Sequence, residues 1–340
     1  MNGFSIIICC YNSARRIDET LRYVSELTIP EGKKCEVLVI NNNSGDNTRE
    51  LAIAKKRTFD ERNIAFCVIE EPRPGLSVAR KTGVDASVYD TVIFCDDDNH
   101  LNPDYLIKAG DVLDRYPNVG IVGGHAKPKF STENREWLKD FFAAMAIGPQ
   151  APADGYVNWV YGAGMILRKE IFSTLEKKNI QFLLSDRSGK ALSSGGDAEI
   201  CSLTLFLGYK IYYSSEIILY HDTPAPRLER KHYIKAKMST IAPSVYLFIL
   251  NELIVDNEAK PGRLYFKKLS ATIRNIFYFT PRMVLGKHQF YSVFMAYRVW
   301  QTLIWLLTSY GQFKNFFEQI LINLSLHGNY GKTSANTATN

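Results

Sequence analysis

Three consecutive aspartates, Asp96, Asp97 and Asp98, follow directly on the apolar residues 91–95 (Thr-Val-Ile-Phe-Cys). An apolar run this short that ends in acids is typical of a buried parallel strand, which brings the carboxylates to the edge of a sheet. Adjacent carboxylates repel one another unless a cation lies among them, and their hard oxygens favour Mg²⁺ or Mn²⁺. The alternative is an acidic turn that caps a helix beginning near Pro103.

Strand and helix patterns alternate regularly through the first half of the chain. The strands are expected at residues 4–10, 35–40, 64–69 and 91–95, and the helices at residues 13–27, 46–54 and 76–86. This alternation predicts an α/β fold with a mostly parallel sheet flanked by helices on both faces. Ligands of such folds bind beyond the carboxyl ends of the strands, which is where the aspartates lie.

Polar side chains also follow two other expected strands. Tyr11 and Asn12 come after the first strand, and Asn41 and Asn42 open the stretch Asn-Asn-Asn-Ser-Gly-Asp-Asn-Thr after the second. Gathered at one sheet edge, these side chains suit a nucleotide. A turn followed by a helix cap explains residues 41–48 as well, because Asn, Ser, Gly and Asp are the residues that turns prefer.

The order of these motifs resembles that of family 2 glycosyltransferases with the GT-A fold. The resemblance covers about the first two-thirds of the chain, in residues 5–12, 39–48, 75–80, 94–99, 162–168, 195–201 and 208–210. It implies a GT-A catalytic domain over residues 1–235. It also implies an inverting enzyme that moves a sugar from a nucleotide-sugar donor to a hydroxyl of a glycan or lipid-linked acceptor.

The resemblance implies roles on the donor side. Asp98 matches the last acid of the D-x-D element, which binds the divalent metal (Mn²⁺ or Mg²⁺) that holds the donor diphosphate. The residues expected to bind the nucleotide sugar are Tyr11, Asn12, Asn41, Asn42, Arg80, Asp96 and Asp97. Many members carry an acidic pair where this chain has Asn41 and Asn42. Because an amide both donates and accepts, the base stays open, with a UDP-sugar as the first expectation. A solvated basic helix face is the alternative for Arg80.

Asp197 matches the family's catalytic base, although Gly196 replaces the glutamate that usually precedes it. Inverting transfer needs one base to take the proton of the acceptor hydroxyl, since the metal replaces the acid that a glycosidase uses. The alternative is that Asp197 caps the helix expected over residues 198–207. The residues expected on the acceptor side are Gly162, Ala163, Gly164, Met165 and Glu199.

Two basic side chains follow the strand expected at residues 216–220. The resemblance places His221 near the metal or the diphosphate, and Arg227 on a segment that closes over the diphosphate. A lone histidine is more often a hydrogen-bonded structural residue, and an exposed arginine needs no such role. Both readings stay open for each residue.

Residues 236–327 form a basic, aromatic-rich region that we expect to be helical. Its composition suits an anionic membrane surface and a lipid-linked acceptor, and packing on the catalytic domain is the alternative. No segment has the ~18 to 20 uninterrupted apolar residues of a spanning helix, and no nucleic-acid-binding motif is present. We expect the tail at residues 328–340 to be disordered.

The overall composition fits a cytoplasmic enzyme. With 340 residues, 46% of them hydrophobic, the chain can bury one large core and carry a smaller appendage. Its six cysteines have no C-x-x-C spacing, which indicates reduced core residues and no zinc site. The resemblance implies bacterial polysaccharide synthesis at the inner face of the cell membrane. A metal-dependent nucleotidyltransferase and a non-catalytic sugar-nucleotide-binding module of the same fold are the alternatives.

Overall fold

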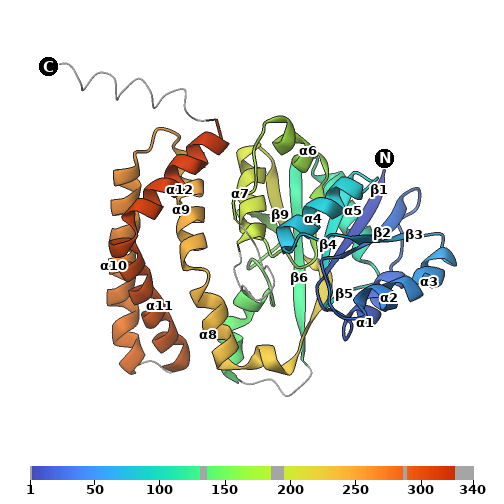
Figure 1. Cartoon of the computed structure of the whole chain (residues 1–340), viewed down its shortest axis with the longest axis horizontal. Helices are drawn as coiled ribbons and strands as arrows, with labels where there is room; N and C mark the ends of the chain where they lie inside the picture. Colours follow the sequence, from blue (N-terminus) through green and yellow to red (C-terminus); the bar gives the residue numbers. More distant parts are fainter. Residues whose placement is uncertain (1, 131–135, 185–194, 286–288, 326–340) are drawn as a thin grey trace.

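The computed structural model describes residues 2–130, 136–184, 195–285 and 289–325 (Figure 1). The tail expected at residues 328–340 lies outside these ranges. A sheet with helices on both faces fills one side of the molecule, and the C-terminal helices stand beside it as a second layer (Figure 1).

The described strands form a single sheet in the order β3-β2-β1-β4-β8-β6-β9-β5, and β7 pairs with β9. Their bounds are β1 Gly3–Cys10, β2 Lys34–Asn41, β3 Ala65–Glu70, β4 Thr91–Asp96, β5 Asn99–Leu101, β6 Val119–Phe130, β7 Gly155–Val157, β8 Met165–Arg168 and β9 Lys210–Thr223. The four strands expected from sequence are confirmed, and they pair in parallel. The sheet as a whole is mixed, because β8 runs antiparallel between β4 and β6.

The catalytic half contains seven described α-helices and two 3₁₀ segments. Their bounds are α1 Ile17–Ser25, α2 Thr48–Ala54, α3 Lys56–Asp60, α4 Leu76–Ala86, α5 Tyr105–Arg115, α6 Glu170–Lys177, α7 Gly196–Phe206, η1 Glu136–Met145 and η2 Ala225–Leu228. The α4 bounds match the expected ones. The helix expected from Ser13 begins four residues later, because the Ser13 carbonyl accepts the N–H groups of Arg16 and Ile17 in a turn.

Alternate residues of the central strands enter two hydrophobic cores, one on each face of the sheet. On β1, Ile7 belongs to one core, whereas Ile6 and Ile8 belong to the other. This follows from the period of two along a strand. Both faces of β1 are therefore buried, which fixes the register of the strand and the position of its carboxyl end.

The C-terminal helices are α8 Arg230–Met238, α9 Ile241–Val255, α10 Pro261–Leu285, α11 Gln289–Thr308 and α12 Tyr310–Asn323. The α9 residues Val245, Ile249 and Leu253 are buried in the same core as Ile7. α9 therefore packs on the catalytic half, while α10 and α11 lie on its far side (Figure 1). The domain boundary expected after residue 235 falls within α8.

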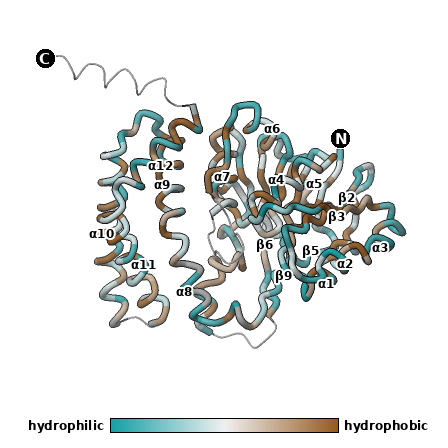
Figure 2. The backbone as a smooth tube through the Cα atoms, in the orientation of Figure 1, coloured by the Kyte–Doolittle hydropathy of each residue, from teal (hydrophilic) through white to brown (hydrophobic). Residues whose placement is uncertain are grey.

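Hydropathy changes repeatedly along the outer helices, where polar and apolar residues alternate (Figure 2). Among the described residues, no helix is long and apolar enough to cross a membrane.

Candidate active site

A cavity of about 680 Å³ opens where β1 and β4 end, and segments far apart in the sequence close it. Its walls come from the strand ends, the start of α7, the end of β9 and the helices α9 and α11. Most of the sequence-predicted site residues line it: Tyr11, Asn42, Arg80, Asp96, Asp97, Asp98, Gly162, Ala163, Asp197, His221 and Arg227. The structure therefore brings these residues together around one cavity.

Asp98 lies at one end of the cavity in contact with both basic residues of the β9 segment. Its side chain is buried, with Oδ1 3.3 Å from His221 Nε2 and Oδ2 accepting a 2.8 Å hydrogen bond from Arg227 Nη1. Burial opposes ionisation of this carboxyl, but His221 and Arg227 outweigh burial and hold its pKa well below the usual range. Asp98 is therefore ionised at neutral pH.

Asp97 has structural partners of its own. Its Oδ2 accepts hydrogen bonds from Ser13 Oγ and, at 2.6 Å, from Arg16 Nη2. Its carbonyl oxygen accepts a 2.7 Å bond from Thr20 Oγ1. Asp97 thus fixes the loop after β1 and the start of α1.

Arg80 is nearly fully buried, contrary to the solvated-face alternative. Its guanidinium lies 3.7 Å from Asp96 Oδ1 and 4.9 Å from the centre of the Phe94 ring. A β-carbon at Gly162 would lie 2.7 Å from Arg80 Nη2, so a glycine is needed there for the guanidinium to fit. The Arg80 guanidinium therefore packs directly against the cavity wall that contains Gly162.

The asparagines after β1 and β2 shape loops. Asn42 donates to the carbonyls of Glu71 and Arg73 and accepts the Gly75 N–H at 2.8 Å, so it ties β2 to the loop before α4. Asn12, at φ 50°, accepts the Gly45 N–H. Asn41 donates to Glu70 Oε2 at 2.9 Å. Asn12 and Asn41 are not among the residues that line the cavity, and their contact with the nucleotide stays a prediction.

Asp197 lies at the start of α7, opposite the strand ends. Its Oδ2 accepts the Gly162 N–H at 3.0 Å and its Oδ1 accepts the Ala198 N–H at 3.1 Å. A β-carbon at Gly162 would come within 3.1 Å of the Asp197 β-carbon. The capping alternative therefore holds in part, and the same two bonds fix the carboxylate at the cavity wall.

Three residues expected on the acceptor side do not line this cavity. Met165 is fully buried in β8, and the Gly164 carbonyl accepts a hydrogen bond from the Tyr105 hydroxyl at 2.5 Å. Glu199 is also fully buried, where it accepts the N–H groups of Leu183 and Leu184 and the hydroxyl of Tyr246. The side chains of Met165 and Glu199 thus face the core, and Gly164 lies just before β8, so contact of these three residues with the acceptor stays a prediction.

Removing the Tyr246 hydroxyl from this buried network should destabilise the protein. In Tyr246→Phe, the buried Glu199 side chain loses one hydrogen-bond donor, which costs about 1–3 kcal/mol of the free energy of unfolding. Urea denaturation measures this loss. The control Tyr265→Phe removes a hydroxyl that donates to the neutral Leu306 carbonyl at 3.1 Å and should cost less. Equal stability of Tyr246→Phe and wild type would contradict the expectation.

Sequence reasoning missed several side chains that line the cavity. Arg16 lies just before α1, Trp159 and Tyr161 lie in the segment before β8, and Arg298 lies on α11. The Gly-rich stretch after residue 161 marked this segment as part of the site, and Trp159 and Tyr161 come immediately before it. For Arg298 the sequence carries no local signal, because helix packing alone brings α11 to the cavity.

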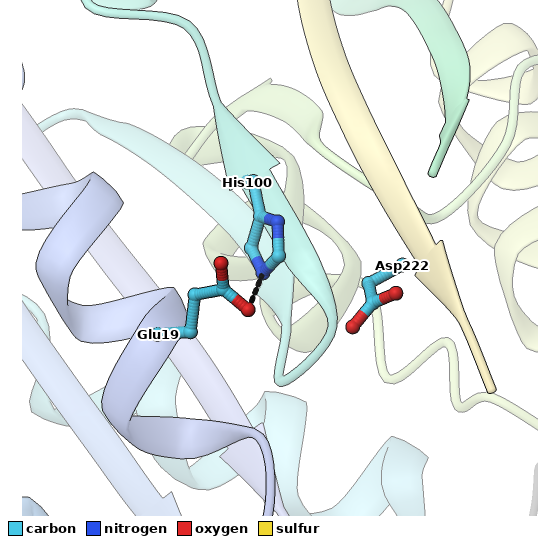
Figure 3. Close-up of side chains that lie close together, drawn as sticks. All are labelled: Glu19, His100 and Asp222. Atoms are coloured by element: carbon cyan, nitrogen blue, oxygen red, sulfur yellow. Dashed lines mark ion pairs between the residues drawn. The ribbon is translucent and has the colours of Figure 1, made fainter. Parts of the chain in front are cut away.

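A second polar cluster lies next to the cavity, formed by Glu19 of α1, His100 of β5 and Asp222 of β9 (Figure 3). His100 Nε2 lies 3.9 Å from Glu19 Oε2. Lys129 Nζ donates to Glu19 Oε1 at 2.7 Å and lies 3.3 Å from His100 Nδ1. Burial, together with the charge of Lys129, lowers the pKa of His100. Since an ammonium group already supplies the positive charge here, this cluster connects elements and is a poor cation site.

Comparisons with known proteins identify the family of this chain and agree with its fold. Residues 5–185, more than half of the chain, match the family model described as glycosyl transferase family 2. Glycosyltransferase AglE of Haloferax volcanii is 32% identical over 123 residues, which are 36% of this chain and 39% of AglE. Succinoglycan biosynthesis protein ExoM of Rhizobium meliloti is 25% identical over 224 residues, 65% of this chain and 67% of ExoM.

One solved structure shows the same fold at low sequence identity. Mannosyltransferase PcManGT from Pyrobaculum calidifontis, in complex with GDP-Man and Mn²⁺, has a TM-score of 0.57 and 17% identity, and the match covers 90% of this chain and 87% of PcManGT. The family match includes the strands that end at the aspartates, but it stops before Asp197. The chain belongs to glycosyl transferase family 2 and is a glycosyltransferase with the GT-A fold.

Proposed function

We propose that this glycosyltransferase moves a sugar from a nucleotide donor to a hydroxyl of a glycan or lipid-linked acceptor, with inversion and with a divalent metal. The observation that carries the proposal is that Asp98, with its partners His221 and Arg227 (the Asp98 cluster), lines the same cavity as Asp197. The bound GDP-Man and Mn²⁺ of PcManGT support a nucleotide sugar and a metal for this fold. A UDP-sugar is the first donor to test.

The residues around Asp98 fit a divalent cation. The Asp98 carboxylate oxygen and the His221 imidazole nitrogen lie 3.3 Å apart, and oxygen and imidazole donors of this kind can together hold Mn²⁺ or Mg²⁺. Asp98 and His221 would hold the ion, with Asp96 next to them at the cavity. When bound, the metal would stabilise negative charge on the leaving diphosphate. Arg227, now on Asp98, would turn its other N–H groups to the phosphate oxygens.

Asp197 is proposed as the general base. Its two backbone hydrogen bonds hold the carboxylate at the wall while leaving lone pairs for the acceptor hydroxyl. As Asp197 takes the hydroxyl proton, the acceptor oxygen bonds to the anomeric carbon and the bond from that carbon to the diphosphate breaks. The nucleoside diphosphate leaves with the electron pair, and the product has the opposite anomeric configuration.

Sugar nucleotides screened for Mn²⁺-dependent thermal stabilisation test this proposal. A ligand at a hundred times its dissociation constant adds ~2.7 kcal/mol to the free energy of unfolding. The products of slow donor hydrolysis then identify the reaction: a nucleoside diphosphate is expected, and a nucleoside monophosphate together with a sugar 1-phosphate would indicate nucleotidyl transfer. Absence of stabilisation by every sugar nucleotide would overturn the proposal.

We also propose that the outer helices attach the enzyme to an anionic membrane surface. Residues 259–317 contain nine Lys and Arg and no Asp or Glu. On α11 an exposed apolar stripe repeats at helical spacing through Val293, Tyr297, Trp300, Ile304 and Leu307. Each basic residue near such a surface contributes about 1 kcal/mol, and the stripe adds apolar burial.

Vesicle flotation tests the membrane proposal with the full chain, because α9 shares the core of the catalytic half. The protein should float with anionic vesicles at low salt and be released at high salt, and Trp300→Glu should weaken flotation severalfold. Val88→Glu is the matched control, since Val88 in the catalytic half and Trp300 are both 45% exposed. Equal flotation of the two variants, or no flotation of wild type, would leave α10 and α11 with a packing role alone.

A further inference from the structure

One wall of the cavity comes from the C-terminal helices and contains a basic residue, Arg298, to which the proposed metal and donor binding assign no role. The C-terminal helices supply this wall through Thr240, Pro243, Ser244 and Leu247 at the start of α9 and through Arg298 of α11. Nothing in the family match, which ends at residue 185, assigns a role to these residues.

Contacts connect this wall to the proposed base. A β-carbon at Gly195, which precedes α7, would lie 3.6 Å from both Pro243 and Leu247, so the start of α9 lies against the start of α7. Arg298 Nη2 donates to Thr240 Oγ1 at 3.3 Å. Thr240 and Pro243 are separated by three residues of rise, about 5 Å along the helix. Arg298 is therefore bonded to the N-terminal end of the helix whose Pro243 and Leu247 lie beside Gly195.

A second cation strengthens the positive potential at this place. Lys268 of α10 lies with Nζ 4.8 Å from the centre of the Phe248 ring. Burial, and then the charge of Arg298, lower the pKa of Lys268, which indicates that the two cations are near each other. Two basic groups held close together in a partly buried place attract an anion.

Aromatic rings also line the cavity, on the segment just before Gly162. Trp159 is substantially exposed, lines the cavity and packs edge-to-face on Tyr161, with ring centres 5.1 Å apart. Flat apolar rings with nearby polar groups suit a ligand with an apolar face and hydroxyls, such as a sugar. An acceptor whose hydroxyl reaches Asp197 would thus extend past Trp159 toward Arg298.

We propose that Arg298 is a specificity-determining residue that binds a phosphate group of the acceptor, which makes a glycosyl phosphate the preferred acceptor end. The guanidinium presents paired N–H donors that match phosphate oxygens. This inference rests on the proposed function, since it places the acceptor between the base and the C-terminal helices. It also gives those helices a role inside the reaction site, separate from membrane attachment.

The test measures binding of glucose 1-phosphate to the full chain with the donor site filled by Mn²⁺ and the nucleoside diphosphate found in the thermal screen. Wild type should bind glucose 1-phosphate at least tenfold more tightly than methyl glucoside. Arg298→Gln should weaken this binding about tenfold or more without changing nucleotide affinity. Ser244→Asp, which keeps Arg298 and adds a negative charge to the same wall, should have the same effect.

Arg263→Gln is the matched control, since Arg263 on α10 is largely exposed and pairs with Asp256 at 3.2 Å. It should leave phosphate binding unchanged. Equal binding of glucose 1-phosphate by wild type, Arg298→Gln and Ser244→Asp would overturn the proposal. Tighter binding of glucuronate than of glucose 1-phosphate would also overturn it, in favour of a carboxylate acceptor.

Two further arms separate the remaining questions. Tighter binding of the decyl phosphodiester of glucose than of glucose 1-phosphate, with the same Arg298 dependence, supports a lipid-linked phosphate, and equal binding supports a phosphate within the glycan. If no nucleoside diphosphate binds with Mn²⁺, the proposed function fails. The same titration on nucleotide-free protein then still decides whether Arg298 binds phosphate.

Discussion

Asp197→Asn should lower sugar transfer by about 100-fold or more while donor binding stays at the wild-type level. The loss has the usual size of a general-base contribution. An amide oxygen still accepts the Gly162 N–H that holds the side chain now, so the fold and the cavity wall are preserved. What disappears is the group that takes the proton of the acceptor hydroxyl. Single-turnover transfer at saturating donor, with calorimetric donor affinity measured alongside, checks both halves of the expectation.

The matched control for this variant is Asp154→Asn. The Asp154 carboxylate also accepts a backbone N–H, that of Ser215 at 2.8 Å, and it is not among the cavity-lining residues. Its loss should leave transfer unchanged. If Asp197→Asn transfers sugar at nearly the wild-type rate, another group is the base. A loss of donor affinity would instead mean that Asp197 supports the donor side through Gly162 and Arg80.

The donor side of the site could be predicted because parallel strands impose it. β1 and β4 are buried on both faces, so their apolar runs are short and continuous, and the residues that follow must meet at one edge. This reasoning placed Tyr11, Asp96 and Asp98 at the cavity. It did not distinguish the residues that line the cavity from those that lie beside it at the same sheet edge. Asn12 accepts the Gly45 N–H, and Asn41 donates to Glu70.

The acceptor side depends on tertiary packing, which local patterns do not contain. Glu199 follows Asp197 by two residues, and a helix turns such neighbours about 200° apart, so one faces the cavity and the other the core. The antiparallel direction of β8 and the position of Arg298 of α11 at the cavity also depend on tertiary packing. They are set by contacts between segments far apart in the sequence, as when Ser202 of α7 bonds to Asn251 of α9.

Asp98→Asn should remove the metal-dependent part of donor binding. Asp98 is the ionised, buried acid at the cavity end, and an amide is a much weaker ligand for a hard divalent cation. Since substitutions around metal ligands cost roughly 10- to 100-fold in affinity, loss of the ligand itself should cost about 100-fold or more. Calorimetric titration of the donor with and without Mn²⁺ measures the effect. The wild-type affinity should rise with the metal, and that of the variant should not.

Asp97→Asn separates metal binding from the general effect of removing a charge at this strand end. Asp97 is bound to Ser13 and Arg16, away from His221 and Arg227, so its loss should lower the free energy of unfolding while the Mn²⁺ dependence of donor binding persists. If Asp98→Asn keeps the wild-type metal dependence, the cation is held elsewhere. The ion pair of Asp98 with Arg227 would then be a structural contact that anchors η2 to the end of β4. The opposite responses of two neighbouring carboxylates are therefore the decisive measurement, because their charges are equal and their partners differ.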